Sequence, residues 1–425
     1  MKLAVTILFC CGVLVDWAAT TVQGENWPQF RGPTRQGIST ETGLPVHWNA
    51  ETGENVAWRR VIPGKGWSSP VVVDGRIYLT TAVPLQEGDN PDYSLRALCL
   101  DAKSSNVLWD VEVFRRLAAN SERIHPKNSH ASPTPIVDGD KMFVHFGTHG
   151  TACLNLDGSI VWKNEELIYE PQHGSGGSPA LVDDALVISC DGRDTQFVVC
   201  LERHDGSIRW KVPRETFDAD KKFAFHTPLA IEVDGQKQVV STGANSVSGF
   251  DLTTGDAIWT VRHDGYSVVP RPVYAHGLVF ICTSFQNSSM LAIRPDGHGD
   301  VTETHVAWTS RDAVSHSPSP IIVGGHLYMV SDRGIGTCRD AQTGELIWKK
   351  RFGGSYSASP ILADGHLYFQ SEQGDGVVIN PGTTFEEVAR NSIGQPTLAS
   401  YAVSEGSFYV RSETHLYRIE ETGGK

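Results

Sequence analysis

This sequence of 425 residues has little that would direct it to nucleic acid or into a membrane. Asp and Glu outnumber Lys and Arg by 49 to 36, so the formal net charge is −13. A chain this acidic has no general basic surface to neutralise phosphates, which argues against nucleic-acid binding. After the first 24 residues no segment reaches about 18 consecutive apolar residues, so we expect no transmembrane helix in the mature chain.

Common catalytic and cofactor motifs are also missing. The sequence contains no G-x-S-x-G elbow, no P-loop, no H-E-x-x-H and no haem-attaching C-x-x-C-H. None of its insertions holds a recognisable set of Asp, Glu and Asn residues for calcium. From these absences we predict no catalytic residue, no metal site and no cofactor.

Residues 1–24 are expected to be a cleaved secretory signal peptide. Lys2 provides a positive start, and a mostly apolar stretch from Leu3 to Val15 follows it. Small and polar residues fill positions 18–24, which favours cleavage at the end of this segment. Asp16 interrupts the apolar run and makes an anchoring helix the weaker alternative. We expect an exported protein, in the periplasm or outside the cell.

A repeated unit fills nearly all of the remaining chain. In residues 319–348, two apolar runs flank the pair Gly324-Gly325, and such a pair indicates a β-hairpin. Two further strands lead to Trp348 and complete a four-stranded antiparallel unit. Each unit opens with a Ser/Thr-Pro-like signal, at Pro70, Pro135, Pro179, Pro228, Pro272, Pro320, Pro360 and, with Tyr in the proline position, Tyr401.

These eight signals lie 40 to 65 residues apart. Four-stranded repeats of about 40 to 45 residues are typical of propeller blades. We therefore predict an all-β fold, a single eight-bladed β-propeller of four-stranded antiparallel blades over residues 48–425. Residues 25–47, rich in proline and glycine, are predicted to be an arm that packs on the ring through its aromatic side chains.

The ring is predicted to close through its two ends. Residues 56–62 look like the last strand of a blade, whereas residues 400–425 look like a blade that lacks its last strand. Pairing the N-terminal strand with the C-terminal ones would complete blade eight and remove an open sheet edge.

The third and fourth strands share the pattern A-x-D-x-x-T-G-x-x-x-W. Thr-Gly suits a tight turn, and a large Trp at a fixed position can pack on a small residue of the neighbouring blade. We predict that these tryptophans dock the blades: Trp58, Trp109, Trp162, Trp210, Trp259, Trp308 and Trp348. Blade seven departs from the pattern, with Val388 in the Trp position.

This pattern resembles the pyrroloquinoline quinone (PQQ) repeat of quinoprotein dehydrogenases and of the outer-membrane assembly scaffold BamB, both eight-bladed propellers. The resemblance covers about residues 50–425. The segment NWPQFRGP, running into WSSPVVVDGRIYLTT, resembles a group of exported bacterial PQQ-like repeat proteins. In this family the Trp positions imply docking between blades and do not imply a cofactor.

The resemblance leaves two classes of function. A BamB-like role implies an exported binding or assembly scaffold with protein partners in the cell envelope. The alternative is a PQQ-dependent oxidoreductase, of the alcohol or sugar dehydrogenase type, with PQQ and calcium on the axis. Many such dehydrogenases cover the quinone with a disulfide between adjacent cysteines. The only adjacent pair here is Cys10-Cys11, inside the signal, so the scaffold is favoured.

A small-anion site is a third alternative. The residues before each opening proline form a ring of hydroxyls interrupted by one arginine: Ser69, Thr134, Ser178, Thr227, Arg271, Ser319, Ser359 and Ser400. If this ring lines the channel, Arg271 places one positive charge there, suited to a carboxylate or phosphate. The other interpretation is that the hydroxyls cap strand starts and that Arg271 pairs with a nearby acid.

Histidines and cysteines offer weaker signals. Four histidines precede the first strands of their blades: His130, His173, His226 and His316. They could converge on a metal or an anion, but each lies a different number of residues before its strand, which favours scattered loop residues. Six cysteines follow the signal, and most suit buried third strands. Cys190 and Cys200 lie on neighbouring strands of one hairpin, so a disulfide between them is an open alternative.

Blade one carries the two largest insertions, residues 84–94 and 115–128. The second holds the densest basic cluster, which includes Arg115, Arg116, Arg123 and Lys127. Long insertions on a regular scaffold often carry function, but a solvated surface loop is the favoured interpretation.

Overall fold

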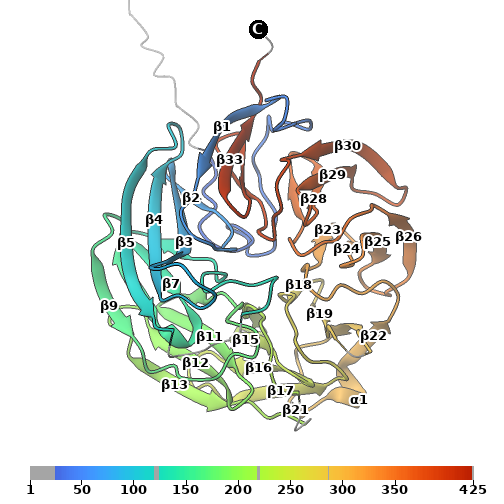
Figure 1. The fold of residues 1–425 in the computed structure, drawn as a ribbon. Coiled ribbons are helices and arrows are strands. Elements are labelled where there is room, and N and C mark those ends of the chain that lie inside the picture. Colours follow the sequence, from blue (N-terminus) through green and yellow to red (C-terminus); the bar gives the residue numbers. More distant parts are fainter. Residues whose placement is uncertain (1–23, 119–123, 218–220, 286, 424–425) are drawn as a thin grey trace, which may run out of the picture.

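The computed structural model describes residues 24–118, 124–217, 221–285 and 287–423. Eight sheets surround a central axis, and the chain passes through them in order around the ring (Figure 1). This arrangement confirms the predicted all-β, eight-bladed propeller. The expected signal peptide lies in residues 1–24, of which 1–23 are outside the described residues. No helix in the described part of the chain is long and apolar enough to cross a membrane.

Blades one to four each use consecutive strands, from the axis outward. Blade one contains β2 (Val71–Val73), β3 (Arg76–Pro84), β4 (Tyr93–Asp101) and β5 (Val107–Arg116). Blade two contains β6 (Ile136–Asp138), β7 (Lys141–His145), the short 3₁₀ helix η1 (Gly147–His149), β8 (Thr151–Asn155) and β9 (Ile160–Asn164). Blade three contains β10 (Ala180–Val182), β11 (Ala185–Asp191), β12 (Gln196–Glu202) and β13 (Ile208–Pro213). Blade four contains β14 (Leu229–Val233), β15 (Gln236–Thr242), β16 (Ser246–Asp251) and β17 (Ala257–Arg262).

Blades five to eight follow the same plan, with one insertion. Blade five contains β18 (Val273–Ala275), β19 (Leu278–Cys282), β20 (Met290–Ile293) and β22 (Val306–Ser310); β21 (Gly299–Asp300) and α1 (Thr302–His305) lie in its insertion. Blade six contains β23 (Ile321–Val323), β24 (His326–Val330), β25 (Ile335–Asp340) and β26 (Leu346–Arg351). Blade seven contains β27 (Ile361–Ala363), β28 (His366–Gln370), β29 (Asp375–Asn380) and β30 (Glu386–Ser392). Blade eight contains β31 (Ala402–Ser404), β32 (Ser407–Arg411), β33 (His415–Glu420) and β1 (Val56–Val61).

Blade eight closes the ring with strands from both ends of the chain. β1 pairs antiparallel with β33, from Val56 opposite Ile419 to Val61 opposite His415. The prediction that the N-terminal strand completes the last blade is therefore confirmed. Without β1, the outer backbone groups of β33 would form an open sheet edge.

Tight turns between the first and second strands explain why the same signal recurs in each blade. At Asp74 and Gly75 the backbone φ angles are 49° and 70°, in the left-handed region that a type I′ turn requires. The first turn residue is also left-handed in other blades: Asp183, Asp234, His276, Asp364 and Glu405. These turns set the register of the inner hairpins.

Six of the seven tryptophans join one blade to the next. Each indole N–H donates a hydrogen bond of 2.8–3.1 Å to a backbone carbonyl of the following blade: Trp58 to Ala102, Trp109 to Leu156, Trp162 to Arg203, Trp210 to Leu252, Trp308 to Ala341 and Trp348 to Gly382. Gly206 shows how close the contact is, because a Cβ atom there would lie 2.5 Å from the Trp162 ring. Trp259 differs and donates to Gln238 of its own blade at 2.8 Å.

The six cysteines after the signal are buried free thiols. The alternative that Cys190 and Cys200 form a disulfide is therefore wrong. In the ladder between β11 and β12, Cys190 lies opposite Phe197 and Cys200 lies opposite Val187. The two thiols are thus offset by three residues, about 10 Å along the strands, too far for a disulfide.

Candidate functional site

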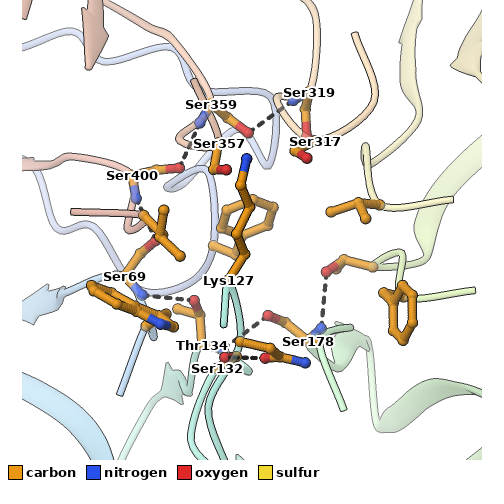
Figure 2. A pocket seen from close by; sticks show the side chains of 18 of the residues that line it. Ser69, Lys127, Ser132, Thr134, Ser178, Ser317, Ser319, Ser357, Ser359 and Ser400 are labelled. Atoms are coloured by element: carbon orange, nitrogen blue, oxygen red, sulfur yellow. Dashed lines mark hydrogen bonds between the residues drawn. The ribbon is translucent and has the colours of Figure 1, made fainter. Parts of the chain in front are cut away.

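Seven Ser and Thr side chains before the first strands form a hydroxyl belt around the axis, and six of them are labelled in Figure 2. Each hydroxyl oxygen accepts a hydrogen bond of 2.8–3.1 Å from a backbone N–H of the adjoining blade. In donor-to-acceptor order the pairs are Ser69 to Thr134, Thr134 to Ser178, Ser178 to Thr227, Arg271 to Ser319, Ser319 to Ser359, Ser359 to Ser400 and Ser400 to Ser69. The belt therefore links blades as well as lining the axis.

Arg271 occupies the eighth position, but it is not among the described residues that line the cavity, and its guanidinium bonds backbone carbonyls. Its Nε and Nη2 donate to the carbonyl of Pro228, and its Nη1 donates to the carbonyls of Phe30 and Arg35 at 3.2 and 2.9 Å. Burial lowers the pKa of Arg271 to about 9, and the charges of Arg31 and Arg35 act in the same direction. Backbone carbonyls accept the hydrogen bonds of Arg271, whereas our alternative interpretation had placed a nearby acid there. The geometry gives no support to Arg271 as an anion ligand in the channel.

The arm, residues 25–47, covers one end of the axial channel. It hydrogen-bonds residues of blades one, two, five, six and seven, namely Val72, Val137, Tyr274, Pro320 and Leu362. Arg31 is 1% exposed and donates to the carbonyls of Pro320 and Pro360 at 2.9 and 3.3 Å. Burial lowers the pKa of Arg31 to about 9. The arm is therefore an integral part of the ring that seals the channel at the side of the first hairpin turns.

Above the arm, the hydroxyl belt encloses a cavity of about 330 Å³. Phe30 of the arm lines it at the sealed end, and aromatic residues line the open end, including Trp67, Phe225 and Phe285. Asp332 and Lys127 are the acidic and basic residues among its described lining, which also includes His125 and His173. The cavity is therefore a cup with hydroxyl walls and an aromatic mouth.

Lys127 extends over the space inside the belt (Figure 2). Its Nζ lies 2.6 Å from Oε1 of Glu372, which belongs to the turn after β28 in blade seven. The Ser357 hydroxyl donates to the same carboxylate oxygen at 2.6 Å. The end of the blade-one insertion thus reaches across the cup to the opposite wall, and the predicted insertion supplies a residue of the cavity.

The cavity does not fit the calcium of the oxidoreductase alternative. Calcium takes six to eight oxygen ligands, several of them carboxylates. Asp332 is the carboxylate among the described lining, and it already accepts from the Ser317 hydroxyl at 2.7 Å and from the backbone N–H groups of His316 and Ser317. The belt hydroxyls are weak calcium ligands, so the donor set gives no support to a PQQ–calcium centre.

The four predicted histidines do not meet at one point. Among the described residues there is no group of three or more His, Cys, Asp or Glu side chains that could hold a metal ion. His173 lines the cavity, with its ring 5.3 Å from that of His125. His316 Nε2 lies 3.0 Å from the Ser288 hydroxyl, and the His130 ring packs 4.8 Å from Tyr93.

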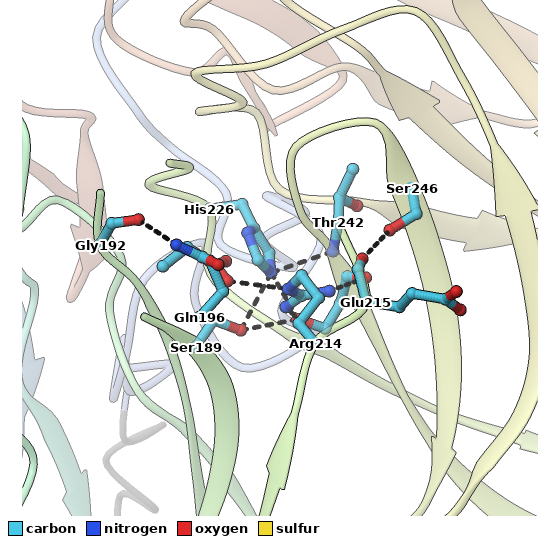
Figure 3. Close-up of polar contacts among 10 residues, drawn as sticks. Ser189, Gly192, Gln196, Arg214, Glu215, His226, Thr242 and Ser246 are labelled. Carbon is cyan, nitrogen blue, oxygen red and sulfur yellow. Dashed lines mark hydrogen bonds and ion pairs between the residues drawn. The ribbon is translucent and has the colours of Figure 1, made fainter. Parts of the chain in front are cut away.

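His226 belongs to a buried polar cluster between blades three and four (Figure 3). Its Nε2 accepts from the Thr242 N–H at 3.0 Å, so the proton of the neutral ring is on Nδ1. Arg214 donates to Asp191 at 2.8 Å in the same cluster, and both side chains are at most 1% exposed. Burial raises the pKa of Asp191, although Arg214 opposes the shift. The cluster lies outside the cavity lining, so we assign it to blade packing.

Together these features define a closed eight-bladed β-propeller with an axial cup that is sealed at one end. A family model described as outer membrane protein assembly factor BamB matches residues 30–166, 148–304 and 299–384. These matches span more than half of the sequence, and the chain belongs to this family. No curated protein matches the sequence.

Solved structures share the fold at low sequence identity. BamB from Moraxella catarrhalis has a TM-score of 0.61 and 12% identity, over 87% of this chain and 98% of that one. A europium-containing methanol dehydrogenase has a TM-score of 0.65 and 10% identity, over 91% and 89%. A quinohemoprotein alcohol dehydrogenase from Pseudomonas putida has a TM-score of 0.63 and 12% identity, over 94% and 81%. At such identities the likeness concerns the fold alone.

Proposed function

We propose that this chain is an exported scaffold of the cell envelope that binds partner proteins along its outer strands. The observation that carries the proposal is an apolar patch on neighbouring outer strands of blades one and two. We call Val107, Leu108, Ile160 and Val161 the outer-rim patch; they are 40%, 49%, 37% and 44% exposed. Adjacent exposed apolar residues of this kind are typical of interaction sites.

The two halves of the outer-rim patch lie close together. Trp109 of β5 donates to the Leu156 carbonyl just before the turn into β9, and its ring packs on Gly158 in that turn. Leu108 and Ile160 flank this junction in the sequence, and we propose that the patch forms one surface across the joint between the two blades.

We propose that the partner binds by adding one of its own strands to the outer edge of a blade. β5, with ten residues, has an outer edge whose backbone groups are unpaired within the sheet order of the described strands. In blade four the corresponding edge of β17 is paired in parallel with β21, through Trp259 and Thr260. The outer edge of a blade thus accepts a short extended segment. We propose that β5 or β9 binds an extended segment of an envelope protein in the same way.

Site-specific photo-cross-linking in the native host tests this function. A photoreactive residue at Val107, which is 40% exposed, should form an adduct with a partner. Adding L108E and I160E to the same chain should abolish that adduct because charge opposes burial of the patch. Leu346 is the matched control, since it is 40% exposed at the start of the outer strand of blade six, away from the patch.

A functional readout accompanies the cross-linking. In cells that lack the chain, the wild type should restore the level of outer-membrane proteins and L108E/I160E should not. Equal adducts from Val107 and Leu346, or full restoration by L108E/I160E at normal abundance, would contradict the docking proposal. Mass spectrometry of the mature N-terminus in a periplasmic extract tests export separately.

A further inference from the structure

We infer that the axial cavity is a binding site for a neutral carbohydrate of one or two rings. The inference goes beyond the proposed scaffold function and concerns a different surface, because the cavity lies on the axis and the outer-rim patch on the circumference. Three features carry it: the unused hydroxyl donors of the belt, the aromatic mouth and the balance of charge.

The belt offers a circle of hydroxyl donors. Each of its oxygens accepts a backbone N–H, which leaves the hydroxyl hydrogen and one lone pair for another partner. Among the described residues no belt hydroxyl donates to a protein acceptor in a recorded hydrogen bond. The side chains are at most 5% exposed, and a buried hydroxyl without an acceptor loses hydrogen-bonding free energy. A ligand with many oxygen atoms would satisfy these donors.

The mouth adds apolar faces to these polar walls. Phe285 is 46% exposed, and its ring lies 4.9 Å from His316 and 6.2 Å from Tyr266. Phe225 and Trp67 line the same opening. A sugar ring has hydroxyls at its edge and C–H groups on its faces, so it can pack on aromatic side chains while its edge meets the belt.

The charges of the cavity favour a neutral ligand over an anion. Lys127 is held by Glu372, and Asp332 adds a second negative charge at the mouth. Arg271, which would have supplied a positive charge, bonds the arm and Pro228 instead. The carboxylates of Asp332 and Glu372 would therefore repel an anion, and the Lys127 ammonium group is already paired with Glu372. A neutral sugar would leave the Lys127–Glu372 ion pair intact.

The size of the cavity agrees with this class of ligand. About 330 Å³ lies at the lower end of the volumes of small-molecule pockets. The arm seals the far end, so the ligand must enter and leave through the aromatic mouth. A short saccharide fits this cup, whereas a long polysaccharide threading through the ring does not.

Titration calorimetry on the whole mature chain tests the inference. The probes are glucose, galactose, mannose, maltose, trehalose and sucrose, each up to about 10 mM, with inorganic phosphate and acetate as the anions. We expect at least one sugar to bind with one-to-one stoichiometry and neither anion to bind. The F285A variant should weaken sugar binding about tenfold through the loss of stacking.

Phe217 provides the matched control, because it is 38% exposed and lies outside the cavity lining. The F217A variant should bind the sugar as the wild type does. Failure of every sugar to bind would overturn the inference. So would saturable phosphate binding without sugar binding, or equal sugar affinity in F285A and the wild type. None of these results bears on cross-linking at the outer-rim patch, so the two proposals fail independently.

Discussion

At the residue scale, burial changes the acid–base behaviour of several side chains that are remote from the cavity. His145 at the end of β7 is 2% exposed, and its Nδ1 lies 2.8 Å from the Thr151 hydroxyl oxygen. Burial lowers the pKa of His145 to about 3, and the neighbouring His149 acts in the same direction. The folded protein thus keeps this ring neutral over a range in which the unfolded chain protonates it.

This difference predicts a loss of stability in mild acid. Between pH 6.5 and about 3 the unfolded state binds more protons at His145 than the folded state, so the free energy of unfolding falls as the pH falls. At pH 5.5, one unit below the ordinary value, the expected loss from this residue is about 1.4 kcal/mol. Urea unfolding at pH 7.5 and 5.5 measures it in the wild type and in H145Q.

The H145Q variant should lose less stability than the wild type between the two pH values, because glutamine does not titrate. H47Q is the control, since His47 is exposed, and its pH dependence should equal that of the wild type. Identical pH dependence in H145Q and the wild type would show that His145 is not the group responsible.

At the scale of elements, the residue that directly follows the arm, Trp48, replaces a side chain that blade seven lacks. The Trp position of blade seven holds Val388, which packs against the cluster that contains Trp48. Trp48 is 2% exposed, stacks 6.1 Å from Tyr368 of blade seven and lies 5.5 Å from Phe408 of blade eight. A tryptophan from outside the repeat therefore fills the joint between these blades.

Removal of this side chain should destabilise the whole ring. We expect W48A to lower the free energy of unfolding by about 3–5 kcal/mol, as for other large aromatic residues truncated to alanine in a core. W48F should cost less because most of the packing remains. Chemical unfolding provides the measurement, with F217A as a surface control expected within about 0.5 kcal/mol of the wild type. A W48A value as small as that of F217A would contradict this role.

The same elements show what the sequence could predict. The Asp-Gly turns and the Trp pattern are local and repeated, so they predicted eight blades, and pairing the incomplete units at the two ends predicted the position of β1. The belt hydroxyls also share one position per blade. Arg271 shares that position, yet its long side chain turns to carbonyls of the arm, a choice that depends on tertiary contacts.

Residues at the mouth of the cup were harder to find. Phe225, Phe285, Asp332 and Glu372 come from loops of different blades with no shared spacing, so periodicity gives no signal for them. The alternating strand pattern likewise placed Cys190 and Cys200 in one hairpin but did not give their register. Lys127 had a sequence signal as part of the basic insertion, and His173 had one as a histidine that precedes a first strand.

At the scale of the whole molecule, the ring depends on contacts between residues far apart in the sequence. Ser400 donates to Ser69 in the belt, and β1 pairs with β33 across nearly the full chain. Such contacts form only after a large loop closes, which costs conformational entropy. The first and last blades thus meet at the axis through Ser69 and Ser400, and β1 closes the outer edge by pairing with β33. The arm contributes differently, because it crosses one end of the channel.

Two deletions of the mature chain separate these contributions. Without residues 25–47 the channel loses its seal, but Trp48 and β1 remain, so we expect a folded monomer with a lower melting temperature. Without residues 25–61 the chain also loses Trp48 and β1, and the outer edge of β33 becomes free to pair with other molecules. We expect the second variant to aggregate, which analytical ultracentrifugation and circular dichroism will show.

A peptide with the sequence of residues 48–62, which supplies both Trp48 and β1, distinguishes loss of this segment from general damage. Added to the shorter variant during refolding, it should occupy the edge of β33, let Trp58 dock on Ala102 again and restore a monomeric β-sheet protein. A peptide with Trp58 replaced by Ala keeps the strand but loses the docking bond, so it should restore less. If the deletion of residues 25–61 yields a stable monomer without any peptide, then closure by β1 is not what prevents association of the ring.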